Sequence, residues 1–382
     1  MAAVDRFDFL LKDISAHYTE LFVPDFKSFT LKDWLALVGA VYCTGKAICV
    51  AYNAWNLTKV HGLSRLGQPD LVKKYGPWAV VTGCTSGLGK AFVTELAGTG
   101  FNVVLVSRSS RKLNELASTL GTTFGVQTVA IPVDFNDGEQ VYFKIKNELE
   151  DKEVGVLVNN VGVMYDYPQM FLEVPEEKLW NLINVNVSAA TMMTHMLLPD
   201  MVERGYGAVI TVSSGSCLKP TPLMTGYSAT KAYLTYFMDA LSYEYRDSGV
   251  TFQCLMPFYV ATRMTSFSKT LQNTTLWIPS ATDYVRQALQ TLGWSPRTAG
   301  YFPHTIQAYL ISWIPDQLWM WASCRLNQAF KRHAHTRIRH RSGEGSRRSS
   351  RSTSFTELAG LSSSTSLPKI AETQQLRRNS NV

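Results

Sequence analysis

Residues 82–89 read Thr82-Gly83-Cys84-Thr85-Ser86-Gly87-Leu88-Gly89 and join an apolar run at 78–82 to an amphipathic stretch at 87–97. Closely spaced glycines between a strand and a helix allow a tight turn. They also let the backbone and the helix N-terminus approach a pyrophosphate without a Cβ in the way. Glycines of this kind occur in ordinary turns as well, but the flanking strand and helix supply the context that a dinucleotide-binding turn requires. This stretch therefore predicts a nucleotide-binding α/β fold.

Around this turn, short apolar runs alternate with helical stretches over residues 76–304. The pattern predicts strands at 78–82, 103–106, 129–133, 154–158, 208–212 and 252–256, and helices at 87–97, 111–120, 139–149, 176–204 and 226–246. Such alternation implies right-handed crossovers and a parallel sheet that is covered on both faces. We therefore predict a single doubly wound Rossmann domain.

Composition excludes several classes of protein. The 382 residues are 46% hydrophobic and 18% charged, which is too apolar for a disordered chain. The net charge of +7 comes from residues 331–382, with 11 Lys or Arg against 3 Glu, while the remainder has 26 basic and 27 acidic residues. A near-neutral body argues against a nucleic-acid partner. The six cysteines show neither disulfide-scaffold density nor metal-site spacing, so we expect reduced thiols and no metal.

Residues 1–75 contain an apolar segment at 34–57 that is long enough to cross a bilayer. Lys46 near its middle costs roughly 3 kcal/mol, which six of its seven Leu, Ile and Val residues would offset at roughly −0.5 kcal/mol each. The alternative is a helix that packs on the protein or lies in the membrane interface. Within 20 residues of the segment, two Lys or Arg precede it and four follow it, so a spanning helix would leave the body on the cytosolic side. Six acidic residues among the first 33 argue against a cleaved leader.

Residues at the ends of the next three strands concern how a nucleotide would bind and which nucleotide it would be. Arg108 ends the second predicted strand, where an acid would bind a ribose 2′-hydroxyl and an Arg suits a 2′-phosphate. This favours NADP(H), although Arg108 could also be a solvated strand end. Asp134 follows the third strand and could accept a hydrogen bond from an adenine amino group or cap the next helix. In Asn160-Val161-Gly162, the glycine suits a close approach of backbone to the cofactor.

Tyr227 and Lys231 lie four residues apart in a predicted helix and so share a face. An ammonium beside the phenol favours the phenolate and should lower the pKa of Tyr227 from about 10, which makes a usable general acid or base. Ser214 ends a strand 13 residues before Tyr227. A Tyr-x-x-x-Lys pair alone is common by chance, but in this order after a dinucleotide turn it predicts an active site.

These motifs in this order resemble the short-chain dehydrogenase/reductase family over residues 76–304. The resemblance implies that Tyr227 is the catalytic acid or base, Ser214 hydrogen-bonds the substrate carbonyl, Lys231 orients the nicotinamide ribose and Asn186 holds a proton-relay water. The cofactor-binding residues it implies are Gly83, Ser86, Gly87, Leu88, Gly89, Arg108, Asp134, Asn160, Val161, Gly162, Tyr227, Lys231, Pro257, Val260 and Thr262.

Within the family, the apolar N-terminal segment and Pro257-Phe258-Tyr259-Val260-Ala261-Thr262 resemble the microsomal branch of very-long-chain 3-oxoacyl-CoA reductases and hydroxysteroid dehydrogenase-like proteins. Two departures concern the cofactor: Val161 replaces the usual Ala, and Phe258 replaces the usual Gly. Members of this branch can carry Phe at the tyrosine position and are then regarded as inactive, whereas this sequence keeps Tyr227.

The resemblance implies an NADP(H)-dependent oxidoreductase that transfers a hydride to the carbonyl of a lipophilic substrate, with 3-oxoacyl thioesters and ketosteroids as leading classes. We expect membrane lipid as a partner and an endoplasmic reticulum membrane location with a cytosolic catalytic domain, the mitochondrion being the alternative. Whether the protein forms a homo-oligomer is left open by the sequence.

Residues 305–330 form an apolar extension that could cover the substrate pocket, lie on a membrane or pack on a partner, and residues 331–382 should be a disordered basic tail. The rival function is a non-catalytic NADP-binding protein or scaffold at a membrane.

Overall fold

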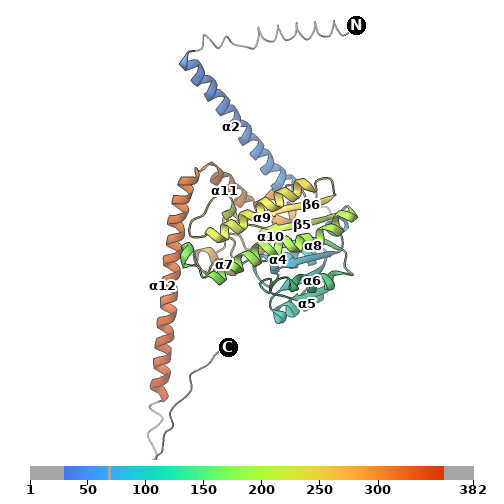
Figure 1. Ribbon diagram of the computed structural model, residues 1–382, viewed down its shortest axis with the longest axis vertical. Helices are drawn as coiled ribbons and strands as arrows, with labels where there is room; N and C mark the ends of the chain where they lie inside the picture. Colours follow the sequence, from blue (N-terminus) through green and yellow to red (C-terminus); the bar gives the residue numbers. More distant parts are fainter. Residues whose placement is uncertain (1–29, 68–69, 357–382) are drawn as a thin grey trace, which may run out of the picture.

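The computed structural model describes residues 30–67 and 70–356 and contains a parallel seven-stranded sheet of order β3-β2-β1-β4-β5-β6-β7 (Figure 1). The strands are β1 Trp78–Thr82, β2 Asn102–Ser107, β3 Thr128–Pro132, β4 Val154–Asn159, β5 Gly207–Val212, β6 Val250–Leu255 and β7 Arg297–Thr298. The strand order reverses between β1 and β4, which is where open α/β sheets bind ligands. The predicted doubly wound fold is confirmed.

Helices cover both faces of the sheet. One face packs against α4 Gly87–Gly98, α5 Ser110–Phe124 and α10 Ala281–Gln290, and the other against α6 Gln140–Leu149, α8 Ala189–Arg204 and α9 Thr225–Glu244. Neighbouring strand residues alternate between these two cores: Val81 belongs to the first and Val80 to the second. Strands that are buried on both faces read as continuous apolar runs, which is why the sequence located them well.

The predicted helix at 176–204 has three parts. α7 Glu176–Leu182 leads into a π-helical segment, Ile183–Ser188, and then into α8. A π-helical segment in an α-helix often marks a functional site. Here it contains Asn186.

The N-terminal helix α2, Leu31–His61, includes the predicted segment 34–57 and extends away from the body (Figure 1). Among the described residues it is the helix whose length and composition would allow it to cross a membrane, and no residue of its apolar window is buried. Its last residue holds it to the body, because the His61 Nε2 and Thr305 Oγ1 atoms lie 2.7 Å apart in a buried contact.

Two helices follow the sheet: α11 Phe302–Trp313 and α12 Asp316–Thr356. Pro315 separates them, as the sequence indicates. The helix α12 continues through residue 331, where the sequence predicts the start of a disordered tail. The difference arises because Lys331 pairs with Glu173 and the His335 ring lies 4.9 Å from the Tyr167 ring, so this part of α12 packs on the body. Residues 357–382 of the predicted tail and the acidic segment 1–29 lie outside the described residues.

Candidate active site

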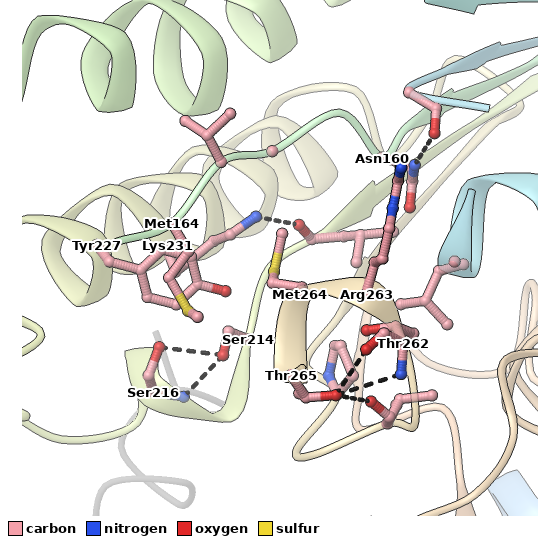
Figure 2. A pocket seen from close by; sticks show the side chains of 18 of the residues that line it. Asn160, Met164, Ser214, Ser216, Tyr227, Lys231, Thr262, Arg263, Met264 and Thr265 are labelled. Carbon is pink, nitrogen blue, oxygen red and sulfur yellow. Dashed lines mark hydrogen bonds between the residues drawn. The ribbon is translucent and has the colours of Figure 1, made fainter. Parts of the chain in front are cut away.

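A cavity of about 600 Å³ opens at the carboxyl ends of the central strands (Figure 2). Its lining includes fifteen of the residues expected from the sequence, contributed by the glycine-rich turn, the loops after β2, β3 and β4, the end of β5, α9 and the loop after β6. The lining residues among those expected are Gly83, Ser86, Gly87, Leu88, Arg108, Asp134, Asn160, Val161, Gly162, Ser214, Tyr227, Lys231, Pro257, Val260 and Thr262. Gly89 and Asn186 lie behind this wall.

The three glycines of the turn have different constraints. Gly83 has a φ of +68°, and a Cβ there would lie 2.9 Å from the Cα of Val161. A Cβ on Gly89 would lie 2.3 Å from the carbonyl oxygen of Gly83, so this residue allows α4 to pack on the turn. Gly87 has a φ of +57° and faces open space except for Thr262. Gly87 is thus the position at which the backbone faces the cavity.

The N-terminus of α4 has no side-chain cap. The first N–H groups of a helix lack intrahelical partners and favour an anion, so an uncapped N-terminus at the cavity suits a phosphate. The Ser86 hydroxyl, at the cap position, accepts a hydrogen bond of 2.7 Å from Nη2 of Arg263. Arg263 also lines the cavity, and among the described residues no carboxylate forms an ion pair with it. Arg263 was not among the residues expected from the sequence, because 177 positions separate it from Ser86 and no local motif joins them.

Arg108 and Asp134 meet at the other end of the nucleotide region. Nη1 of Arg108 lies 3.4 Å from Oδ2 of Asp134, and the Arg108 side chain is 68% exposed. Oδ1 of Asp134 accepts a hydrogen bond from the backbone N–H of Asn136, so Asp134 stabilises a turn and does not cap α6. Lys112 of α5 lines the same part of the cavity and is a second cation that the sequence analysis missed.

Asn160 joins the loop after β4 to the glycine-rich turn. Its Nδ2 atom donates to the carbonyl oxygens of Thr82 (2.9 Å) and Gly83 (3.3 Å), and its backbone N–H donates to the Thr82 hydroxyl. The Thr82 hydroxyl also accepts from the N–H of Val161. These bonds fix the cavity wall from β1 to Gly162.

Tyr227, Lys231 and Ser214 converge on one part of the cavity (Figure 2). The Lys231 Nζ atom donates to the Val212 carbonyl oxygen at 2.9 Å and lies 5.9 Å from the centre of the Tyr227 ring. The Ser214 hydroxyl accepts from the N–H (3.2 Å) and the hydroxyl (3.0 Å) of Ser216, which orients it. An acid, an ammonium and a hydroxyl thus surround one reaction space.

The pKa expected for Tyr227 is corrected by the structure. Burial raises the pKa of the Tyr227 hydroxyl to about 12, and interaction with Ser214 acts in the opposite direction. Burial also lowers the pKa of Lys231 to about 8. The Lys231 ammonium bonds Val212 and lies near the phenol ring, so in this arrangement it does not offset the burial of the Tyr227 hydroxyl.

Asn186 supports the site from behind. Its side-chain amide exchanges two hydrogen bonds with the backbone of Val163, at 2.8 and 3.0 Å, and donates to the Thr230 hydroxyl at 3.0 Å. A Cβ on Gly162 would lie 3.4 Å from both Asn186 Oδ1 and Lys231 Nζ. The side-chain amide therefore bonds protein atoms, and Gly162 keeps the space beside Lys231 open.

The Pro257–Thr262 loop closes the nicotinamide end of the predicted site. The Phe258 ring occupies the space where Gly215 lacks a Cβ, since that atom would lie 2.8 Å from the ring. The backbone N–H of Phe258 donates to Nδ1 of His304, 3.3 Å away. The Phe258 side chain therefore packs over Gly215. Position 258 is where the family resemblance leads us to expect glycine.

The rest of the cavity is mainly apolar and is closed by α12. Its side chains come from loops around the site and from the first turns of α12: Met164, Met224, Met264, Phe267, Trp319, Ala322, Ser323, Leu326 and Asn327. Asn327 holds α12 there by donating to the Pro222 carbonyl oxygen at 2.8 Å. Of the three roles left open for the apolar extension, the structure places its later part, in α12, over the cavity.

The family model for short chain dehydrogenase matches residues 77–272, which include the glycine-rich turn, Ser214, Tyr227 and Lys231. The chain belongs to the short-chain dehydrogenase family.

Two named relatives differ in what their names say about activity. Inactive hydroxysteroid dehydrogenase-like protein 1 from Homo sapiens is 45% identical over 335 residues, which is 87% of this chain and 98% of the relative. Very-long-chain 3-oxoacyl-CoA reductase from Anas platyrhynchos is 39% identical over 284 residues, which is 74% of this chain and 88% of the relative.

Among solved structures, a short-chain dehydrogenase from Sphingobium yanoikuyae in complex with NADPH is 28% identical, with a TM-score of 0.52. The match covers 56% of this chain and 83% of that one. Short-chain dehydrogenases typically bind a nicotinamide nucleotide, and the cavity described here has the glycine-rich turn and uncapped helix that such a ligand requires.

Proposed function

We propose that this short-chain dehydrogenase is an NADP(H)-dependent oxidoreductase that reduces a carbonyl of a lipophilic substrate. The convergence of Tyr227, Lys231 and Ser214 in the cavity that also contains the glycine-rich turn carries this proposal. We further propose that α2 anchors the protein in the endoplasmic reticulum membrane with the catalytic body in the cytosol.

The residues around the cavity fit NADP(H). The uncapped N-terminus of α4 suits the pyrophosphate, with Gly87 open to it and Arg263 beside it. Arg108 and Lys112 are cations that line the cavity near the end of β2, where a 2′-phosphate would bind. Bound there, the nicotinamide would supply the hydride.

The protein's own groups then handle the proton and the developing charge. A phenol whose pKa is about 12 is protonated at neutral pH, so Tyr227 can donate a proton to the carbonyl oxygen during reduction. Ser214 can donate a hydrogen bond to the same oxygen as negative charge develops. Lys231, next to Gly162 and the Tyr227 ring, is positioned to orient the ribose.

The apolar part of the cavity supports a lipophilic substrate. Methionine and aromatic side chains line it, and α12 covers it. Long acyl thioesters and ketosteroids both combine a carbonyl with a large apolar body, so the cavity supports these two classes.

The comparisons favour a second function. The human relative carries the name inactive, at a higher identity than the relative that is named a reductase. Phe258 also stands in the cofactor loop where the family resemblance leads us to expect glycine. In this second function the chain binds NADP(H) without turnover and acts through its membrane location.

The deciding experiment combines nucleotide binding and turnover. Purified full-length protein is assayed for NADPH affinity and for NADPH oxidation with a panel of 3-oxoacyl-CoA and ketosteroid substrates. Tyr227→Phe should abolish reduction and leave NADPH affinity nearly unchanged. Ser214→Ala should lower turnover by about 10² to 10³, as for loss of an oxyanion donor.

Tyr236→Phe is the matched control, because Tyr236 lies on the same helix and is 81% exposed. It should leave both affinity and turnover unchanged. A wild type that binds NADPH but reduces no member of the panel would support the second function. Turnover that survives Tyr227→Phe would overturn the assignment of the acid.

A further inference from the structure

The α11–α12 corner, defined as residues 310–321, carries large apolar side chains that the protein leaves exposed. Leu310 and Trp313 are 64% and 61% exposed, and Leu318 and Trp321 are 53% and 60% exposed. The corner lies at the same end of the molecule as α2 (Figure 1). A contiguous exposed apolar surface of this kind marks an interaction site.

A direct contact joins this corner to α2. Between residues 34 and 58 of α2, the charged residue is Lys46. Its ammonium lies 5.5 Å from the centre of the Trp313 ring and 5.6 Å from that of Tyr42. Aromatic faces stabilise an ammonium most where water is excluded, so the two rings would stabilise the Lys46 ammonium in apolar surroundings. The apolar surface of α2 thus continues onto the corner through Trp313.

The corner itself contains little charge, and the Arg325 guanidinium beside it lies 5.8 Å from the centre of the Trp321 ring. Between Arg297 and Arg325 the sequence contains one charged residue, Asp316. In the structure Asp316 pairs with Lys219. A docking surface for a soluble protein usually has a polar rim, whereas an apolar surface with tryptophans and a basic residue at its border is typical of lipid contact.

The two faces of α12 differ at the corner. Leu318 and Trp321 are exposed, whereas Trp319 and Ser323 line the cavity. One turn of helix therefore separates the exposed apolar surface from the apolar part of the cavity.

We propose that the α11–α12 corner docks into a lipid bilayer beside α2 and enters one leaflet without crossing it. The 12 residues of α11 extend about 18 Å, which is shorter than the roughly 30 Å hydrocarbon core. In this docked arrangement, the end of the cavity that α12 covers would lie next to the membrane. The docking itself rests on no catalytic step, so it stands whether or not the chain turns over.

The test uses full-length protein in phosphatidylcholine vesicles that contain lipids with a nitroxide on the acyl chain. An environment-sensitive fluorophore is attached through Leu310→Cys or Leu318→Cys, one at a time. The background carries alanine at the exposed and half-buried native cysteines, which are Cys43, Cys49, Cys217 and Cys324. Matched controls place the fluorophore through Leu172→Cys or Tyr236→Cys, at positions that are 94% and 81% exposed.

Docking predicts that the nitroxide lipids quench the probes at positions 310 and 318, and that a water-soluble quencher does not reach them. The probes at positions 172 and 236 should show the opposite behaviour. Access of the water-soluble quencher to positions 310 and 318 would overturn the proposal. Protection of these positions from both quenchers would also overturn it, because a protein surface would then cover the corner. Lipid quenching at all four positions would overturn selective docking.

Discussion

Burial of the Lys231 ammonium lowers the free energy of unfolding of the protein at neutral pH. Its side chain is 3% exposed, and burial lowers its pKa to about 8 from 10.5. The Val212 carbonyl oxygen is a neutral acceptor, so no opposite charge offsets the loss of water. A buried, unpaired cation of this kind is typical of a functional site.

Lys231→Met should therefore make the folded protein more stable at pH 7 while lowering NADPH affinity. Between pH 8 and 10.5 the folded wild type has lost the Lys231 proton and the unfolded chain keeps it, so the free energy of unfolding of the wild type rises with pH. The difference between variant and wild type should shrink by about 3 kcal/mol over this window. Denaturant unfolding at pH 7 and pH 10 measures it. Lys90→Met, at an exposed site on α4, is the control, and a pH-independent difference for Lys231→Met would contradict the assignment.

Arg108→Ala should weaken NADPH binding by about 2 kcal/mol and leave NADH binding nearly unchanged, because one charge-assisted contact to the 2′-phosphate is lost. Equilibrium titration with both nucleotides measures the difference. The control is Arg111→Ala, since Arg111 pairs with Glu115 on the exposed face of α5. Equal losses for NADPH and NADH would show that Arg108 does not read the phosphate.

Arg263→Ala should behave differently from Arg108→Ala. Arg263 donates to Ser86 at the glycine-rich turn, where we propose that the pyrophosphate common to both nucleotides binds. We expect similar losses of NADPH and NADH affinity, about 1 to 3 kcal/mol for a charge-assisted contact. The same titration decides it, and a loss confined to NADPH would place Arg263 at the 2′-phosphate instead.

Most residues of the candidate site could be predicted because their motifs are local. The glycine-rich turn and the Tyr227–Lys231 pair are each readable from a few neighbouring positions. Arg263 could not be read in this way, because its partner Ser86 is brought near only by the order of the strands. The predicted shift in the pKa of Tyr227 was wrong in direction, because the helical spacing of Tyr227 and Lys231 does not show how deeply the Tyr227 hydroxyl is buried.

At the scale of elements, the six longer strands were predicted to within two residues because each is a mainly apolar run, buried over most of its length except in β3, where Ile131 alone is buried. β7 has two residues, too few to show periodicity. α10 was missed although Ser280 caps it and Tyr284, Val285, Ala288 and Leu289 form an apolar face. The π-helical segment that contains Asn186 depends on backbone hydrogen bonding that side-chain patterns do not report.

The position of α12 over the cavity depends on a buried bond. Asn327 is 4% exposed and donates to the Pro222 carbonyl oxygen, whereas the Lys331–Glu173 pair is exposed to solvent and should contribute less to the position of α12. Asn327→Leu should leave that carbonyl unpaired, cost about 1 to 3 kcal/mol and increase hydrogen exchange in α12. Gln328→Leu, at the exposed neighbouring position, is the control. Unchanged exchange in the Asn327 variant would show that other contacts hold α12.

At the scale of the molecule, the body and α2 differ in how they relate to solvent. The body buries its apolar residues around the sheet, while α2 exposes the apolar window that the sequence marks as a membrane segment. The sequence could not show that Lys46 faces Trp313, because this contact joins elements far apart in the chain.

Full-length protein should remain in membranes through a carbonate wash, and protease added from the cytosolic side should digest the body. The physical reasons are the length of the exposed apolar window of α2 and the basic residues that follow it. Immunoblotting of washed and protease-treated membranes measures both. Release by carbonate would make α2 a peripheral helix, and protection of the body would reverse the orientation.

Two adjacent residues at the start of α11 hold different parts of the protein. Thr305 contacts His61 at the end of α2, and His304 accepts from the backbone of Phe258 in the cofactor loop. Deleting α2 to obtain a soluble fragment would therefore remove one of the two partners of the Thr305 hydroxyl, the other being the Tyr301 carbonyl oxygen, one residue from the His304 side chain that supports that loop. A fragment of this kind is an altered protein at the cofactor site, and a lack of turnover in it would not show that the intact chain is inactive.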